Sequence, residues 1–342
     1  MLIKSCLAFL LMLLLTVLTA CGGGGGSSGS GGSGGGGVSL TVSINPNDGI
    51  ALTQSATLSW SSDGTSATLI TKEVATVQAQ NSEVKQDNKP RIIYKKEADG
   101  RVRITHIFYE DDLKEIEQKA TTVNAVGETI ATATLPPSGS MQVSPTKTTT
   151  YTIRATGPNG SAEKSVTLTV IPHTPDELVI IYNSSGIKGQ KPIRWGNGIV
   201  EVYDATGYSR LQEALDAWNQ AIGGPMTLKK SMNPNAPLKI RYDAAYIEQF
   251  FGNNTTVCAV ATLEPPDNDF RIVGANIRFH PNRCVGSHAV MMHEIGHAIG
   301  FLLHTNNGGI MDATVYTDKI DALARIMINR LYQLPIGVPI PF

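Results

Sequence analysis

Alternating polar and apolar residues mark much of the first half of the chain. In Thr149–Ala155 every second position is apolar, as in a strand with one buried face. A Gly-Pro-Asn-Gly sequence at residues 157–160 predicts a hairpin turn. Similar short β-rich runs, with turn residues between them, are Val38–Ile44, Ala56–Ser62, Ser66–Ile70 and Ser161–Ile171. The pattern predicts an all-β module over residues 38–172.

Composition changes inside this module. Residues 72–119 carry 20 charged side chains, 10 of each sign. Arg91–Tyr94 and Arg101–Phe108 flank an Asp-Gly turn and predict a β-hairpin, while Asp111–Thr121 predicts a short helix. We interpret about residues 71–126 as an insertion into the β module. We favour a solvated loop, and the alternative is a recognition surface or a shield over the following domain.

Helices and strands mix in residues 174–342. Apolar runs predict strands at Gly198–Tyr203, Leu238–Tyr242 and Ala275–Phe279. Amphipathic helices are predicted at Leu211–Ile222 and Ile320–Tyr332. The mixture predicts an α+β domain.

The N-terminus predicts an export signal. The apolar run Cys6–Leu18 is shorter than the ~20 residues that span a bilayer, but it suits a signal peptide over residues 1–20. Leu18-Thr19-Ala20-Cys21 resembles the lipobox of bacterial lipoproteins, which implies lipid on Cys21 and a membrane anchor. Residues 22–37 hold 12 Gly and 4 Ser and predict a flexible tether. The alternative is an ordinary signal peptide with a chance cysteine.

Charge and cysteine content narrow the class of protein. The net charge is −1, from 28 basic and 29 acidic residues, which argues against nucleic-acid binding. Cys258 and Cys284 remain after export and lipidation, and two cysteines in an exported chain predict a disulfide that adds roughly 3–4 kcal/mol of stability. Metal binding by this pair is the weaker alternative, because the C-x-x-C spacing is absent.

The strongest motif is His293-Glu294-Ile295-Gly296-His297. Two histidines four residues apart lie on one face of a helix, so both imidazoles reach one metal, while Glu294 reaches a water beside it. Ser287 is the expected N-cap and Gly300 the expected helix stop. A catalytic zinc needs a third protein ligand. No glutamate follows the motif, and the candidates are His304, Asp312, Asp318 and Asp321.

These residues resemble the metzincin zinc proteases, and most of residues 190–340 resembles their matrixin branch. The likeness rests on the motif, Gly300, a following histidine and Gly309-Ile310-Met311, which resembles the Met-turn. Metzincins place the third histidine three residues after the glycine, where Leu303 stands here; the resemblance therefore implies His304, shifted by one. Met311 is implied as an apolar floor beneath the metal.

The β module has a resemblance of its own. Thr57–Ser61 and Ser144–Tyr151 resemble bacterial Ig-like domains, which implies a β-sandwich. The resemblances thus imply an Ig-like sandwich with an insertion at its middle, followed by a metzincin-like α+β domain with a mixed, twisted sheet and an active-site helix.

The expected function is zinc-dependent cleavage of proteins or peptides by a monomeric, membrane-anchored endopeptidase. One Zn²⁺ is held by His293, His297 and His304, and Glu294 is the general base. An extended peptide pairs with the edge strand near Val260–Leu263. The expected location is the cell envelope of a bacterium, at the outer membrane if Gram-negative, facing the periplasm or the surface. The alternative is an adhesin or binding lipoprotein with a structural or degenerate metal site.

Overall fold

The alternating runs of the first half form two antiparallel sheets, because each strand buries one face and leaves the other in water. A computed structural model describes residues 37–74, 91–96, 102–107, 129–184, 190–252, 257–315 and 317–341. The predicted signal peptide, Cys21, residues 22–36 of the tether and the predicted helix at Asp111–Thr121 lie outside these residues. Residues Gly37–Phe342 form one compact unit.

The first sheet has the order β1-β3-β8 and the second the order β10-β9-β4-β7. Their side chains enclose an apolar core that includes Leu58, Trp60 and Ile153. In the same part of the chain, β2 and β11 form a short parallel pair. The strands are β1 (Leu40–Asn45), β2 (Ile50–Ala51), β3 (Ala56–Ser62), β4 (Ser66–Glu73), β7 (Thr129–Leu135), β8 (Gly139–Val143), β9 (Thr149–Gly157), β10 (Gly160–Leu168) and β11 (Val170–Ile171). We call residues 38–74 and 129–171 the sandwich.

Two hairpins predicted from turn residues are confirmed. Gly157 pairs with Gly160 across a two-residue loop, as the Gly-Pro-Asn-Gly sequence predicts. The charged segment contains β5 (Arg91–Lys96) and β6 (Val102–Ile107), which pair antiparallel. The segment leaves the sandwich after β4 and returns at β7, and these two strands are themselves neighbours in one sheet.

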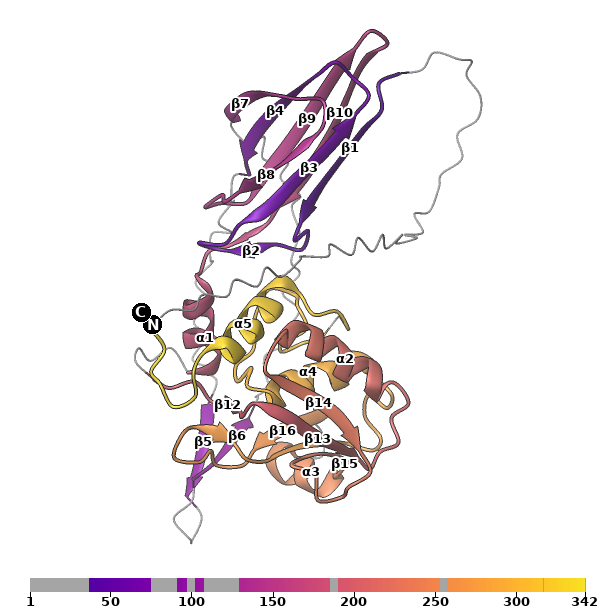
Figure 1. Ribbon diagram of the computed structural model, residues 1–342. Coiled ribbons are helices and arrows are strands. Elements are labelled where there is room, and N and C mark those ends of the chain that lie inside the picture. The colour runs from indigo at the N-terminus through magenta and orange to yellow at the C-terminus, as the bar shows by residue number, and fades with distance from the viewer. Residues whose placement is uncertain are drawn as a thin grey trace, which may run out of the picture. The chain divides into compact units, whose positions relative to one another are not determined.

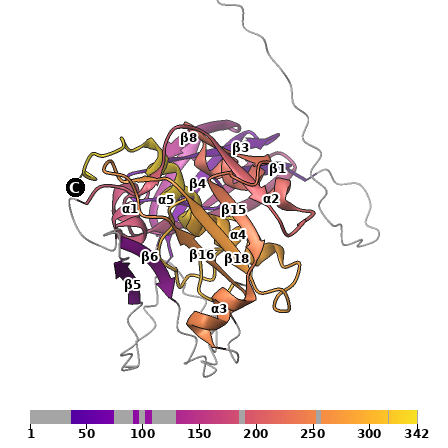
Figure 2. The same cartoon turned by 90° about the horizontal axis from the view of Figure 1, so that it is seen from below.

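Residues 174–341, which we call the C-terminal module, combine a mixed sheet with helices (Figures 1 and 2). The sheet has the order β14-β13-β15-β18-β16-β6-β5, so the hairpin of the insertion extends it. The favoured prediction of a solvated loop is therefore wrong for β5 and β6, because β6 pairs with a strand of the following domain. The first four strands are parallel, and β16 runs antiparallel to β18. A two-stranded parallel pair, β12–β17, lies apart from this sheet. The strands are β12 (Arg194–Trp195), β13 (Gly198–Asp204), β14 (Met226–Ser231), β15 (Leu238–Tyr242), β16 (Ala259–Leu263), β17 (Arg271–Ile272) and β18 (Ala275–Phe279).

The described residues contain five helices. They are α1 (Pro175–Asn183), α2 (Leu211–Ile222), α3 (Ala244–Phe251), α4 (His288–Ala298) and α5 (Ala322–Gln333). Helices α2, α4 and α5 share one apolar core with the sheet, in which Trp218, Ile277 and Ile295 are fully buried. The described part of the chain is therefore a β-rich fold of several sheets with few helices. These five helices all lie in the C-terminal module.

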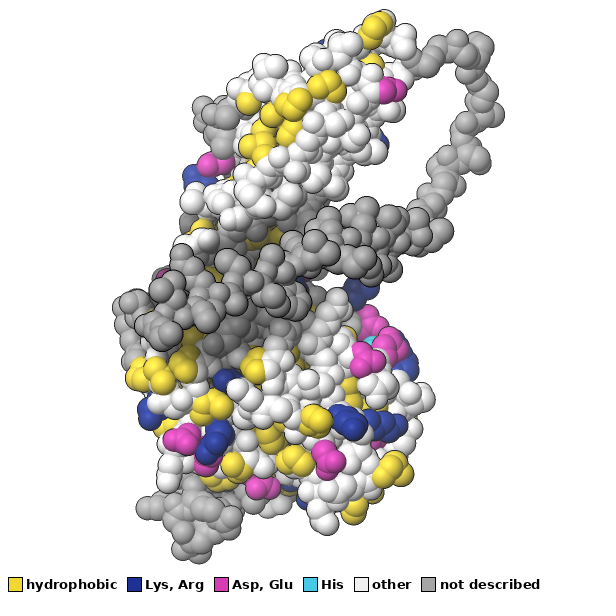
Figure 3. All heavy atoms as spheres, in the orientation of Figure 1, with side chains coloured by type: hydrophobic (Ala, Val, Ile, Leu, Met, Phe, Trp, Pro, Cys, Tyr) yellow, Lys and Arg dark blue, Asp and Glu magenta, His cyan; other side chains and the backbone are white. Residues whose placement is uncertain are grey.

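Two further observations concern the surface. Among the described residues, no helix is both long enough and apolar enough to cross a bilayer. On the face that Figure 3 shows, basic and acidic side chains are interspersed over the C-terminal module. This distribution agrees with the nearly balanced composition of the chain.

Candidate metal centre

Helix α4 carries the metal motif and begins where the sequence predicts. The hydroxyl of Ser287 accepts a hydrogen bond from the backbone N–H of Val290, which caps the first turn. The helix ends at Ala298, and Gly300 then adopts a φ of +110°, a conformation that favours glycine. A side chain at Gly300 would also lie 2.9 Å from the carbonyl oxygen of Ile193. The chain can therefore turn back sharply beneath the helix.

Three aromatic side chains hold α4 in place through its carbonyl groups. The indole N–H of Trp218 donates to Met292, and the indole N–H of Trp195 donates to Ala298. The Tyr332 hydroxyl donates to the carbonyl of Ile299, just past the helix. All three rings are buried. These bonds fix the position of the helix within the core.

His293, His297 and His304 form one cluster. Their Nε2 atoms lie 3.0–3.1 Å from one another. Zinc binds imidazole nitrogens at ~2.0–2.1 Å, so three nitrogens at this separation could all contact one ion. The described residues thus contain a group that could hold a metal ion, and it consists of the three predicted histidines.

The hydrogen bonds of the other ring nitrogens decide which nitrogen carries the proton. His293 Nδ1 lies 2.8 Å from the carbonyl oxygen of Ile310, and His297 Nδ1 lies 2.6 Å from that of Phe301. A carbonyl only accepts, so each Nδ1 is protonated and each Nε2 presents a lone pair. Lone pairs 3.0 Å apart repel unless a cation lies between them, and the donor set therefore fits a metal.

Burial also favours a neutral imidazole in this cluster. Burial lowers the pKa of His293 to about 4, so its imidazole is neutral at pH 7 and free to bind a metal. Burial raises the pKa of Glu294 to about 8, while the backbone N–H of Ala261 donates to this carboxyl and opposes the rise. A dication close to Glu294 would favour its ionised form.

His304 reaches the cluster despite its shifted position. The N–H groups of Leu302 and Leu303 both donate to the carbonyl of Tyr182 in α1, and Leu302 is buried. The N–H of Thr305 then donates to the carbonyl of Met311. These bonds absorb the extra residue and direct His304, which is half-buried, toward the two helix histidines.

Met311 lies under α4 at Gly296. A side chain at Gly296 would collide with the Met311 sulfur and would lie 2.9 Å from the Trp218 ring. Met311 itself is fully buried. The segment before it supplies the Ile310 carbonyl that orients His293, so the turn both packs against the helix and sets an imidazole.

The other candidate ligands lie elsewhere. Asp312 accepts hydrogen bonds from the N–H groups of Gly308 and Ala313. Asp321 caps α5 and also accepts from the N–H of Ile310. Neither belongs to the cluster of possible metal ligands among the described residues. Both aspartates instead shape the loop that carries His304 and Met311.

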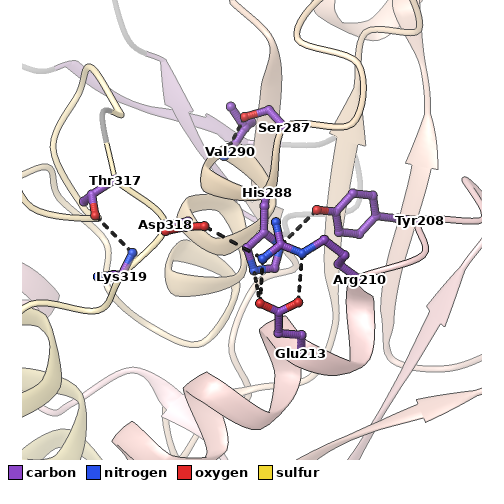
Figure 4. A network of polar contacts seen from close by, with 9 residues as sticks. All are labelled: Tyr208, Arg210, Glu213, Ser287, His288, Val290, Thr317, Asp318 and Lys319. Atoms are coloured by element: carbon purple, nitrogen blue, oxygen red, sulfur yellow. Dashed lines mark hydrogen bonds and ion pairs between the residues drawn. The ribbon is translucent and has the colours of Figure 1, made fainter. Parts of the chain in front are cut away.

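The third candidate, Asp318, belongs to a polar network at the start of α4 (Figure 4). Its carboxylate faces Arg210 at 3.8 Å, and Arg210 pairs with Glu213. His288 Nδ1 lies 2.9 Å from the Tyr208 hydroxyl, and its Nε2 lies 3.7 Å from Glu213. Burial, together with Arg210, lowers the pKa of His288. The network joins α2, α4 and the segment around Asp318.

Cys258 and Cys284 form a disulfide. Cys258 directly precedes β16, and Cys284 lies four residues before α4. The bond therefore connects the strand that supplies Ala261 to the helix that supplies Glu294.

Sequence reasoning did not anticipate Trp195, Tyr332, Tyr182 or Gly296 as parts of the site. Gly296 had a signal, because a glycine inside a helix costs stability and often marks a close approach. The others act through tertiary contacts, for which the sequence offers no local pattern. Comparison with models of known protein families finds no match, and no curated protein matches the chain either.

Proposed function

We propose that this protein is a zinc-dependent endopeptidase whose C-terminal module is a matrixin-like metzincin domain. The observation that carries the proposal is the set of three imidazoles whose Nε2 lone pairs converge at 3.0–3.1 Å. A buried glutamate follows the first of them on the same helix. This donor set leaves one position of a tetrahedral zinc for water or substrate, as hydrolytic zinc sites require.

The arrangement around the cluster supports the proposal. A mixed sheet with one antiparallel strand next to the helix, and a buried methionine beneath the histidines, agree with the resemblance in the sequence. The two antiparallel sheets of the sandwich are likewise compatible with an Ig-like module. We extend the proposal to attachment at the bacterial cell envelope through Cys21, which rests on the lipobox-like sequence alone.

The residues of the chain have distinct parts in hydrolysis. A bound Zn²⁺ would supply polarisation of the scissile carbonyl and a lowered pKa for water. Glu294 takes a proton from the attacking water and delivers it to the leaving amine. The N–H of Ala261 in β16 donates to the Glu294 carboxyl and holds it beside this strand. An extended substrate pairs with β16 through its main chain, so orientation does not demand one sequence.

The test compares the full chain with Glu294→Gln. Gln keeps the shape but cannot accept a proton, so the variant should bind zinc with unchanged stoichiometry and lose casein or gelatin cleavage by at least ~10²-fold. The matched control is Glu163→Gln on the exposed face of β10, which should leave cleavage unchanged. Cleavage by the native chain should stop with a chelator and return with Zn²⁺.

Two results contradict this assignment. Loss of zinc from Glu294→Gln would make Glu294 a ligand instead of the base. No chelator-sensitive cleavage by the zinc-loaded native chain, over varied substrates and conditions, would favour the alternative of a binding lipoprotein with a structural metal.

A further inference from the structure

The charged insertion separates β4 from β7 in the sequence, although these two strands pair with each other. Lys72 near the end of β4 pairs with Thr129 at the start of β7. A short turn could connect these strands, so residues 74–128 are not needed to complete the four-stranded sheet. The insertion carries its β5–β6 hairpin to a different sheet, that of the C-terminal module (Figures 1 and 2).

The hairpin attaches at β16. Thr105 pairs with Thr262 and Ile104 pairs with Leu263, antiparallel. Without β6, β16 would be the last strand of the sheet, and its outer N–H and C=O groups would be open to another strand. The hairpin therefore covers the edge at its C-terminal end.

Hydrogen bonds show which groups of β16 face outward. The carbonyl of Cys258 accepts from His280, and the N–H of Glu264 donates to Gly274, so both groups point inward toward β18 and its neighbouring segments. Backbone groups alternate along a strand, which puts Ala261 and Leu263 on the outer side. Consistent with this, the Ala261 N–H donates to Glu294. The same edge of β16 thus contacts the candidate catalytic Glu294 through Ala261 and, two residues later, the hairpin through Leu263.

We propose that the β5–β6 hairpin is an intramolecular inhibitor that occupies the substrate edge of β16. It is antiparallel to β16 and pairs through its main chain, as an extended peptide would. One edge accepts one strand at a time, so a substrate that pairs at Thr262–Leu263 must displace the hairpin. The inhibitory role rests on the proposed function, whereas the occupancy of the edge does not.

Only two residue pairs join β6 to β16, which makes the contact displaceable. For an edge that is covered nine-tenths of the time, the apparent affinity for substrate falls about tenfold. Removal of the hairpin should therefore raise kcat/KM for an extended peptide by about this factor. The effect should lie mainly in KM, because the metal ligands and Glu294 are untouched.

The experiment uses the full chain and two kinds of variant. One replaces residues 74–128 by Asn-Gly, which closes β4 onto β7 with a hairpin turn. The other is Ile104→Pro, which removes the N–H of β6 that faces Leu263. Its matched control is Ile92→Pro: Ile92 pairs with His106, and alternation directs its N–H away from β6.

The readouts are amide hydrogen exchange at Leu263 and chelator-sensitive cleavage of an extended peptide. We expect faster exchange and about tenfold higher kcat/KM for the replacement and for Ile104→Pro, and neither change for Ile92→Pro. Unchanged exchange overturns the occupancy. Faster exchange with unchanged or lower kcat/KM overturns the inhibition and makes the hairpin a passive or substrate-binding strand. Faster exchange with no cleavage by any chain overturns the proposed function, and the inhibition with it.

Discussion

The sandwich and the C-terminal module bury different kinds of side chain. Among its described residues, the sandwich buries apolar groups and only two polar residues, Thr149 and Thr152. The C-terminal module also buries imidazole, carboxyl, guanidinium, amide and hydroxyl groups: Asn183, Ser184, Arg194, Thr262, Arg278, His280, His288, His293, Glu294, His297 and Thr305. Burial of ionisable groups is costly unless they have partners, so they persist where structure or chemistry requires them.

The sandwich and the C-terminal module also differ in how well they tolerate insertions and substitutions. The sandwich accommodates an insertion between two adjacent strands and keeps their pairing. In the C-terminal module, three single groups determine the geometry of the histidine cluster: Gly296, the Ile310 carbonyl and the shifted His304. We therefore expect substitutions in the sandwich to alter stability alone, and substitutions around α4 to alter metal binding as well.

The largest expected effect is at the third histidine. His304→Ala removes one of three nitrogen ligands, so zinc affinity should fall by at least ~10²-fold, with a matching loss of cleavage. Asp312→Ala serves as the comparison, because its carboxylate contacts backbone N–H groups of its own loop. Zinc content after dialysis distinguishes them. If His304→Ala keeps stoichiometric zinc while Asp312→Ala loses it, the assignment of the third ligand is wrong.

A deletion in the sandwich core should act on stability alone. Leu58 is fully buried, so Leu58→Ala should lower the free energy of unfolding by about 2–5 kcal/mol. Zinc content of the folded variant should stay stoichiometric. Ser59→Ala, at the next position on the opposite face, should change stability by less than ~0.5 kcal/mol. Denaturant titration measures both, and metal loss in folded Leu58→Ala would contradict the separation of the two regions.

A methyl group at Gly296 should have a smaller effect on stability that extends to the metal. Gly296→Ala improves helix propensity but overpacks against Met311 and the Trp218 ring, for a net loss of about 1–3 kcal/mol. Zinc affinity should fall because displacement of Met311 also moves the Ile310 carbonyl that orients His293. Isothermal titration with zinc, alongside denaturant unfolding, measures both effects.

Two further variants control for this interpretation. Gly224→Ala meets only a backbone oxygen at 3.7 Å and should be nearly neutral. Gly296→Ala combined with Met311→Ala should lose less stability than the sum of the two single losses, because the colliding sulfur is then absent. Additive losses in the double variant would mean that the two positions do not interact.

Local signals predicted the helix of the motif and several strands well. Helix α4 begins after Ser287 and ends before Gly300, as the sequence indicates. Helix α2 and strands β3, β15 and β18 have their predicted limits. These elements combine clear periodicity with capping or turn residues. Local chemistry is therefore enough to place them.

Helix α1 was missed although its signal is present in the sequence. Thr174 and Glu177 form a capping box and Pro175 occupies the first turn. Strand β14 gave a weaker signal, because only Met226 and Leu228 are buried in it. Helix α3 was also missed; it is short, and among its residues only Ile247 is buried.

The remaining features depend on contacts between distant segments. The one-residue shift of His304 is accommodated by the Tyr182 carbonyl, more than one hundred positions earlier in the chain. The pairing of β6 with β16 joins strands whose sequences do not specify each other. Main-chain pairing carries little side-chain information, so a sequence predicts the hairpin and not its neighbour.

The Cys258–Cys284 bond determines when the two halves of the site become linked. Thiols stay reduced in a cytoplasm, so in a reducing compartment the chain would lack this crosslink between the segments that precede β16 and α4. Only after it enters an oxidising compartment are the strand and the helix joined covalently. The bond thus links completion of this part of the fold to the redox state of the compartment that holds the chain.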